Sequence, residues 1–149
     1  MRRLPLYALL VLVAFVPLGA EAPRSKEIQF TDVAKQTAEF LGYHRTIELS
    51  ADQEKVKRAA LEALPAPCCS DNSAYTCCCP CNLAKTIWGL SNYLIETQNY
   101  DAKQTRTKVA EWVRFISPNG SSGKACYQGG CPKPFAKGGC GGMTEPVVF

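Results

Sequence analysis

Histidine and methionine are scarce in this chain of 149 residues. The sequence contains one histidine, His44, and two methionines, of which only Met143 lies outside the N-terminal leader described below. A hydrolytic triad would have to use His44, which follows Gly42, the expected stop of a helix, and is therefore expected to be a solvated loop residue. The sequence thus argues against a hydrolase and against a methionine-rich copper carrier.

The chain also lacks a concentrated basic run and a long apolar segment. Its formal net charge is +4, and only +2 without Arg2 and Arg3, which argues against nucleic-acid binding. The apolar stretch 6–16 is well short of the roughly 20 residues of a membrane span. With the two arginines before it and small residues up to Ala20 after it, residues 1–20 are expected to be a cleaved signal peptide. The mature protein would then be periplasmic or extracellular, without a stable membrane span, and the general and twin-arginine export routes both stay open.

The remaining residues, about 130, suffice for one domain with a modest core. Capping residues and apolar spacing predict four helices in them. The first opens at Thr31 or Asp32 and stops at Gly42, the second opens with a capping box of Ser50 and Gln53 and stops at Pro65, the third begins at Pro80, and the fourth opens with Asp101 and Gln104 and stops before Pro118.

Each predicted helix has one apolar face, which is typical of a small helical core. Both tryptophans lie on such faces, so we expect them to pack in the core rather than to stack on a ligand. Only the short segment 45–49 suggests a strand. The expected inward residues are Val33, Thr37, Phe40 and Leu41; Val56, Ala60, Ala63 and Leu64; Leu83, Ile87, Trp88, Leu90, Leu94 and Ile95; and Val109, Trp112, Val113 and Ile116.

The predicted fold is therefore all-α. Residues 21–117 form a four-helix domain with a Cys-rich turn before the third helix. Residues 118–149 form an irregular tail, rich in glycine and cysteine, that is packed on this domain or tethered to it. Dimerisation through spare apolar surface on the third helix is left open.

Cysteine is abundant, and its distribution points to the functional region. Six of the nine cysteines lie in one short segment, and the other three lie in the tail. Adjacent cysteines do not readily bond to each other, because disulfide geometry needs separated, facing Cβ atoms. The dense segment therefore needs several partners or a metal. Its members are Cys68, Cys69, Cys77, Cys78, Cys79 and Cys81, and the tail contributes Cys126, Cys131 and Cys140.

Three uses of these cysteines remain open. In the first, an oxidising compartment produces a disulfide framework, in which the tail cysteines pair with the cluster and one thiol of nine is left over. In the second, thiolates bind a soft metal, either Zn in a closed four-sulfur site of Cys78 and Cys81 with the pair Cys68-Cys69, or Cu(I) among the crowded sulfurs 77–79. In the third, Cys78 and Cys81 form a Cys-x-Pro-Cys redox pair at a helix N-terminus, although the polar segment 70–76 before it is unlike the strand of a thioredoxin-like site.

The sequence around Leu64-Pro65, Pro67-Cys68-Cys69 and Cys79-Pro80-Cys81 resembles bacterial exported proteins that carry a Pro-Cys-Tyr-Cys-Gly-Cys motif. The resemblance covers about residues 50–95, although this chain lacks the Cys-Gly-Cys ending. It implies a small surface or periplasmic protein with helices around a cysteine-dense turn and a metal-linked role.

Together, these features favour an exported protein that binds Cu(I) or Zn through the cysteine cluster, for sequestration or delivery. The expected partners are the metal ion and a metal donor or acceptor protein, and no nucleic acid. The expected metal ligands are the six clustered cysteines, with Cys126, Cys131 and Cys140 as further ligands or disulfide partners. The protein is not expected to be an enzyme, and thiol-disulfide oxidoreductase activity is the alternative.

Overall fold

The computed structural model describes residues 27–120 and 132–149. In this part of the chain the fold is all-α, as predicted, with a single two-stranded sheet. The expected signal peptide, Cys126 and Cys131 lie outside the described residues. Among the residues described, no helix is both long and apolar enough to cross a membrane. The elements are α1 (Val33–Thr46), α2 (Ala51–Glu62), β1 (Pro65–Ala66), β2 (Cys69–Ser73), α3 (Asn82–Glu96), α4 (Ala102–Ile116) and the 3-10 turn η1 (Phe135–Lys137).

Local capping chemistry sets the starts of three helices as the sequence predicts. The Asp32 carboxylate accepts a hydrogen bond from the amide of Lys35 at 2.9 Å, which opens α1. Complete capping boxes open α2, at Ser50, and α4, at Asp101. In each box the cap side chain satisfies an amide of the first helical turn that has no partner within the helix.

Three local predictions were wrong. Gly42 does not stop α1, which continues to Thr46, because its position faces open space and a helix tolerates one glycine there at modest cost. The segment 45–49 is consequently the end of α1 and an irregular link, and is not a strand. Pro80 lies just outside α3, whose N-cap is Cys81.

The extension of α1 also corrects the prediction for His44. This residue is half-buried within α1, and its ring centre lies 5.6 Å from that of Trp88. His44 is therefore part of the contact between two helices and is not a solvated loop residue.

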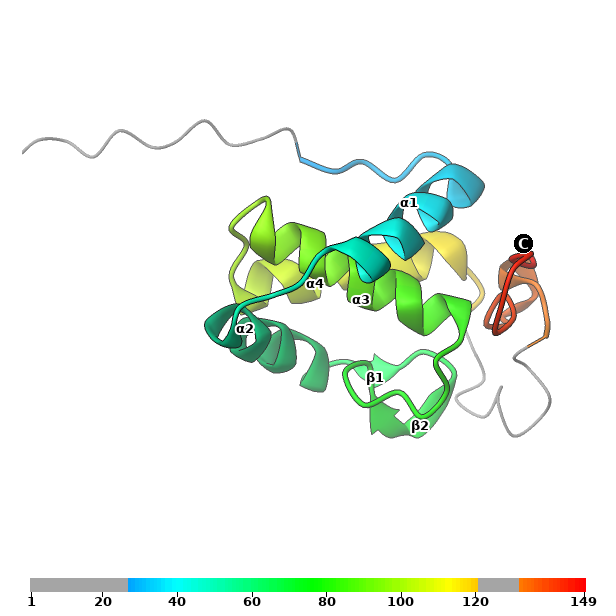
Figure 1. Ribbon diagram of the computed structural model, residues 1–149. Coiled ribbons are helices and arrows are strands. Elements are labelled where there is room, and N and C mark those ends of the chain that lie inside the picture. The colour runs from blue at the N-terminus through cyan, green and yellow to red at the C-terminus, as the bar shows by residue number, and fades with distance from the viewer. Residues whose placement is uncertain (1–26, 121–131) are drawn as a thin grey trace, which may run out of the picture.

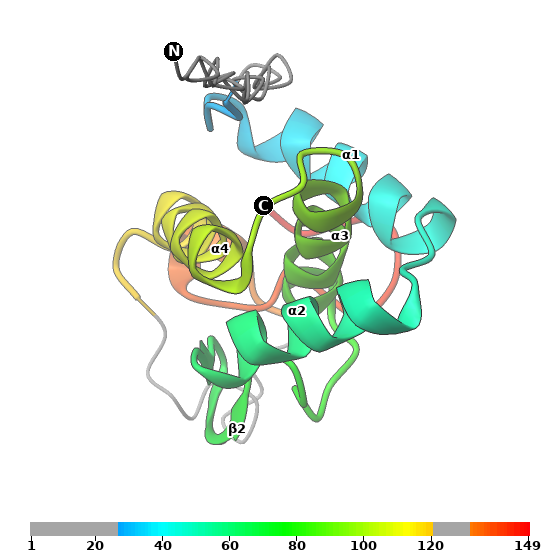
Figure 2. The ribbon, with the colours of Figure 1, turned by 90° about the vertical axis from the view of Figure 1, so that its left-hand side faces the viewer.

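The helix α3 lies at the centre of the bundle and packs against α1, α2 and α4, as Figures 1 and 2 show. Its Gly89 allows α1 to approach closely, because a Cβ atom there would overlap the carbonyl group of Phe40. Trp112 of α4 is fully buried beside Phe40, with ring centres 4.8 Å apart, and its indole N–H donates to Thr86 Oγ1 at 3.1 Å. The predicted inward faces of α3 and α4 thus meet in one core.

The predicted inward face of α2 was partly wrong. Leu61 is fully buried, although it was not among the predicted inward residues, whereas Ala63 caps the helix and is exposed. The α2 helix sits against both α3 and α4, and this position turns Leu61 into the core. A single helix with sparse apolar residues does not reveal that orientation.

The hairpin and the C-terminal segment both lie at the end of the bundle where α3 begins (Figure 1). The backbone amides of Asn82 and Leu83 donate to the carbonyl oxygens of Gly142 and Cys140, at 2.8 and 3.1 Å. The side-chain amide of Asn82 adds bonds to Gly141 O and Thr144 O, at 2.8 and 3.1 Å. Amides at a helix start have no partner within the helix, and here the C-terminal segment supplies acceptors for two of them.

Candidate metal centre

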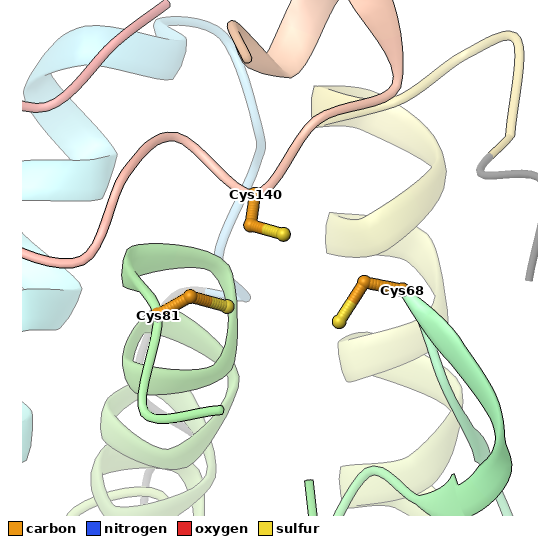
Figure 3. A group of neighbouring side chains, drawn as sticks. All are labelled: Cys68, Cys81 and Cys140. Atoms are coloured by element: carbon orange, nitrogen blue, oxygen red, sulfur yellow. The ribbon is translucent and has the colours of Figure 1, made fainter. Parts of the chain in front are cut away.

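Three cysteines from separate segments converge at the start of α3. Cys68 lies in the turn of the β1–β2 hairpin, Cys81 caps α3, and Cys140 belongs to the C-terminal segment. Their sulfur atoms all lie within 4.8 Å of one another and point into a shared space (Figure 3). Each of the three residues is no more than 1% exposed. Residues more than 50 positions apart thus form one buried group of sulfurs.

A fourth cysteine, Cys77, joins this group. Its sulfur lies 3.9 Å from that of Cys68, and it forms a hydrogen bond with Cys81. Cys77 is also buried. We call Cys68, Cys77, Cys81 and Cys140 the inner sulfur group.

The sulfur spacing of the inner group suits a tetrahedral metal ion. A Zn–S bond of about 2.3 Å places the sulfurs of a tetrahedral site about 3.8 Å apart. The observed 3.9 Å between Cys68 and Cys77 is close to this value, and the 4.8 Å limit among Cys68, Cys81 and Cys140 requires only a small contraction. Cys77 lies beyond that limit from Cys81 or Cys140 and must move closer to complete the shell. A disulfide, with sulfurs about 2.05 Å apart, would require a much larger one.

The electrostatics of the inner group centre on Cys81. Hydrogen bonds from the thiols of Cys140, Cys68 and Cys77 lower the pKa of Cys81, and these outweigh burial, which raises it. The amide of Ala84 in the first turn of α3 lowers it further, although Cys81 makes no N-cap hydrogen bond of ordinary geometry. The surrounding thiols and the helix N-terminus therefore favour the thiolate form of Cys81.

Cys77 shows the opposite shift. A hydrogen bond with Cys68 lowers its pKa, but the bond with Cys81 and burial outweigh this effect and raise the pKa to about 12. Without a cation, burial thus opposes a second negative charge beside Cys81. A bound metal ion removes that opposition, because a coordinating thiol is deprotonated outright.

Backbone geometry of the tail brings Cys140 into the group. Gly139 packs so closely against Lys133 that a Cβ atom would overlap its backbone carbonyl, and Gly141 has a positive φ of 69° beside the Phe135 ring. Both positions suit glycine because no side chain fits. The glycines that flank Cys140 are therefore the sequence signal that could have placed it at the main site, instead of among secondary tail ligands.

The remaining described cysteines interact mainly with one another. Cys78 is exposed and its sulfur lies 3.7 Å from that of the half-buried Cys79. Hydrogen bonding with Cys79, burial and interactions with Cys69 raise the pKa of Cys78 to about 11. Cys69 is fully buried and accepts a bond from the Asn72 side-chain amide at 3.4 Å. We call Cys69, Cys78 and Cys79 the outer sulfur group.

The structure thus divides the cysteines that the sequence analysis treated as one cluster. Cys68, Cys77 and Cys81 belong to the inner group together with Cys140, whereas Cys69, Cys78 and Cys79 form the outer group. Cys78 and Cys81 were expected to share an ion or a redox cycle, but they belong to different groups.

No protein-family model matches the chain, and neither the curated proteins nor the solved structures contain a match. Its function must therefore be argued from the sulfur groups themselves.

Proposed function

We propose that this protein binds a soft metal ion, Zn²⁺ or Cu(I), in the inner sulfur group, for sequestration or delivery. The observation that carries the proposal is the convergence of three buried sulfurs from the hairpin, the start of α3 and the C-terminal segment, with the buried Cys77 sulfur 3.9 Å from one of them. Thiolates select soft cations, and four of them complete a tetrahedral shell.

Binding in this group also has a structural consequence. Cys140 is fully buried against the start of α3, and its own carbonyl oxygen accepts the amide of Leu83. An ion bound by Cys81 and Cys140 would fasten the C-terminal segment to the bundle. Free energy of metal binding would then contribute to folding of this end of the molecule, as in small structural zinc domains.

The proposed setting is an exported protein that exchanges its ion with a donor or acceptor protein. The thiolate is the form of cysteine that reacts with oxidants. An ion bound to the thiolates would therefore protect these cysteines from oxidation after export. The signal-like N-terminus and the resemblance to exported Cys-rich proteins support this setting, and fractionation of cells that produce the full chain would test it.

The experiment compares Cys81→Ser with Cys78→Ser as a matched control. Each protein is purified without oxygen, and its ions are measured by elemental analysis and by absorption after Co²⁺ loading, which reports tetrahedral thiolate coordination. We expect Cys81→Ser to lose the ion of the inner group and its thiolate-to-cobalt absorption, and Cys78→Ser to keep this ion and this absorption. A Cys81→Ser protein with unchanged ion content and spectrum would refute the assignment.

A disulfide between Cys68 and Cys77 is the second candidate, because their sulfurs lie only 3.9 Å apart. In that case the cysteines serve as a structural framework. Intact mass after alkylation of the unreduced, denatured protein separates the two functions. Metal binding predicts that both thiols become alkylated once the ion is removed, whereas recovery of a Cys68–Cys77 disulfide from a metal-free protein would support the framework instead.

A further inference from the structure

We infer that the outer sulfur group is a second metal site, which takes Cu(I) and is open to solvent. Its ligands would be Cys69, Cys78 and Cys79, none of which belongs to the inner group. The role that we assign to it, exchange of copper with a partner protein, rests on the proposed function. The binding site itself does not.

The division into two sites follows from the neighbours that each sulfur contacts. Cys68 in the hairpin turn contributes to the inner group, while Cys69 at the start of β2 interacts with Cys78 of the outer group. Cys77 contacts Cys68, whereas Cys78 contacts Cys79. The pairs Cys68-Cys69 and Cys77-Cys78 thus each supply one sulfur to each site.

Two sulfurs of the outer group are in direct contact, and the third interacts with one of them. The sulfurs of Cys78 and Cys79 are 3.7 Å apart, and hydrogen bonding and charge couple Cys78 to Cys69. A shared ion would have to draw Cys69 closer, because among the described residues only Cys68, Cys81 and Cys140 have sulfurs that all lie within 4.8 Å of one another. The Asn72 side-chain amide donates to Cys69 Sγ and would stabilise it as a thiolate. Two or three thiolates suit Cu(I), a soft ion that accepts low coordination numbers.

The exposure of the group is graded, which suits exchange rather than retention. Cys69 is fully buried, Cys79 is half-buried, and Cys78 is exposed. A thiolate of a partner protein could therefore reach an ion at Cys78 while Cys69 still holds it. The inner group, in which the exposure of each member is 8% or less, offers no such access.

The test is a Cu(I) titration of the full chain without oxygen, against a coloured Cu(I) chelator, after the inner group is loaded with one Zn²⁺ per chain. We expect the wild type to bind one further Cu(I) without release of Zn²⁺. The double variant Cys78→Ser/Cys79→Ser should keep its Zn²⁺ and lose this Cu(I) equivalent. Asn72→Ala should keep both ions and bind Cu(I) about tenfold more weakly, a usual effect of removing a partner of a ligand.

Three outcomes would overturn the inference: no additional Cu(I) in the wild type, uptake of Cu(I) only with stoichiometric loss of Zn²⁺, or an unchanged Cu(I) equivalent in the double variant. Cys81→Ser, with no Zn²⁺ loaded, separates this test from that of the inner site. If it loses the inner ion but still binds Cu(I), and Cu(I) uptake disappears when Cys78 and Cys79 are also replaced, the two sites are independent. If Cys81→Ser keeps the inner ion, the proposed function fails whatever the outer group does.

Discussion

The two ends of this molecule are each stabilised by different interactions. The bundle of α1 to α4 buries large apolar side chains such as Phe40, Leu61 and Trp112, and capping residues open three of its helices. The sulfur-rich end consists of a hairpin with strands of two and five residues and a C-terminal segment with a single 3-10 turn. A hairpin of that size is marginally stable by itself. Burial of large apolar side chains therefore explains the first end, while the second buries only Phe135 and small side chains and depends more on sulfur contacts and hydrogen bonds to α3.

The largest expected effect lies in the bundle. Trp112→Ala should lower the free energy of unfolding by about 3–5 kcal/mol, because it removes a fully buried indole and its bond to Thr86. Urea denaturation followed by helical circular dichroism measures this loss. Trp88→Ala should cost less, since Trp88 is half-buried and bonds to Ala74 beside the hairpin. Equal losses in the two variants would contradict the proposed division between the ends.

Gly89→Ala tests the close packing of α1 on α3. We expect it to destabilise the protein by about 1–3 kcal/mol, because the added methyl group must displace the Phe40 backbone. Gly42→Ala is the matched control within α1, where an added Cβ meets nothing within 4 Å, and it should stabilise the protein by about 0.5–1 kcal/mol. The same urea midpoints report both changes, and a destabilised Gly42→Ala protein would show that α1 does not extend through this position.

Asn82→Ala tests the attachment of the C-terminal segment. The change removes two side-chain hydrogen bonds, to Gly141 O and Thr144 O, and should cost about 1–3 kcal/mol locally. Hydrogen exchange should become faster in the C-terminal segment while the amides of α4 stay protected. Lys85→Met, which removes one exposed bond to Met143 O, should have a smaller effect. Faster exchange throughout α4 would mean that the two ends unfold as one unit.

The smallest expected effect is a pH dependence at the α1–α3 contact. Burial, followed by the charges of Lys57, Lys85 and Arg45, lowers the pKa of His44 in the folded protein. Protonation then favours the unfolded state, so stability is highest above the unfolded pKa of about 6.5 and declines as the pH falls through the lower folded pKa. Melting temperatures between about pH 7 and pH 5 should decline less in His44→Gln than in the wild type. Identical slopes would exclude His44 as the group responsible.

The sequence predicted the features that depend on short stretches of chain. Ser50 with Gln53 and Asp101 with Gln104 form the expected capping boxes, because a cap needs only residues three positions apart. The apolar faces of α3 and α4 were likewise visible as helical spacing. The prediction that α1 stops at Gly42 was wrong because a glycine stops a helix only where the chain must turn. Here the interaction of α1 with α3 continues past this residue.

Local sequence patterns could not predict how the cysteines divide into two groups. The sequence showed Cys140 only as a tail cysteine between glycines, and its position against α3 depends on contacts with residues almost 60 positions earlier. Spacing also suggested that Cys78 and Cys81 act together, yet hydrogen bonds connect Cys81 to Cys68, Cys77 and Cys140. Which sulfur faces which neighbour depends on how the hairpin packs against the start of α3.

The sequence by itself determined an all-α chain with closely spaced cysteines before its central helix, because helical periodicity and composition are local properties. Only the tertiary structure decided that these thiols form two groups and that Cys140 completes the buried one. The physical reason is that a metal site requires sulfurs within a few ångströms of each other. Such proximity between distant residues arises when the hairpin, the helix start and the C-terminal segment pack together.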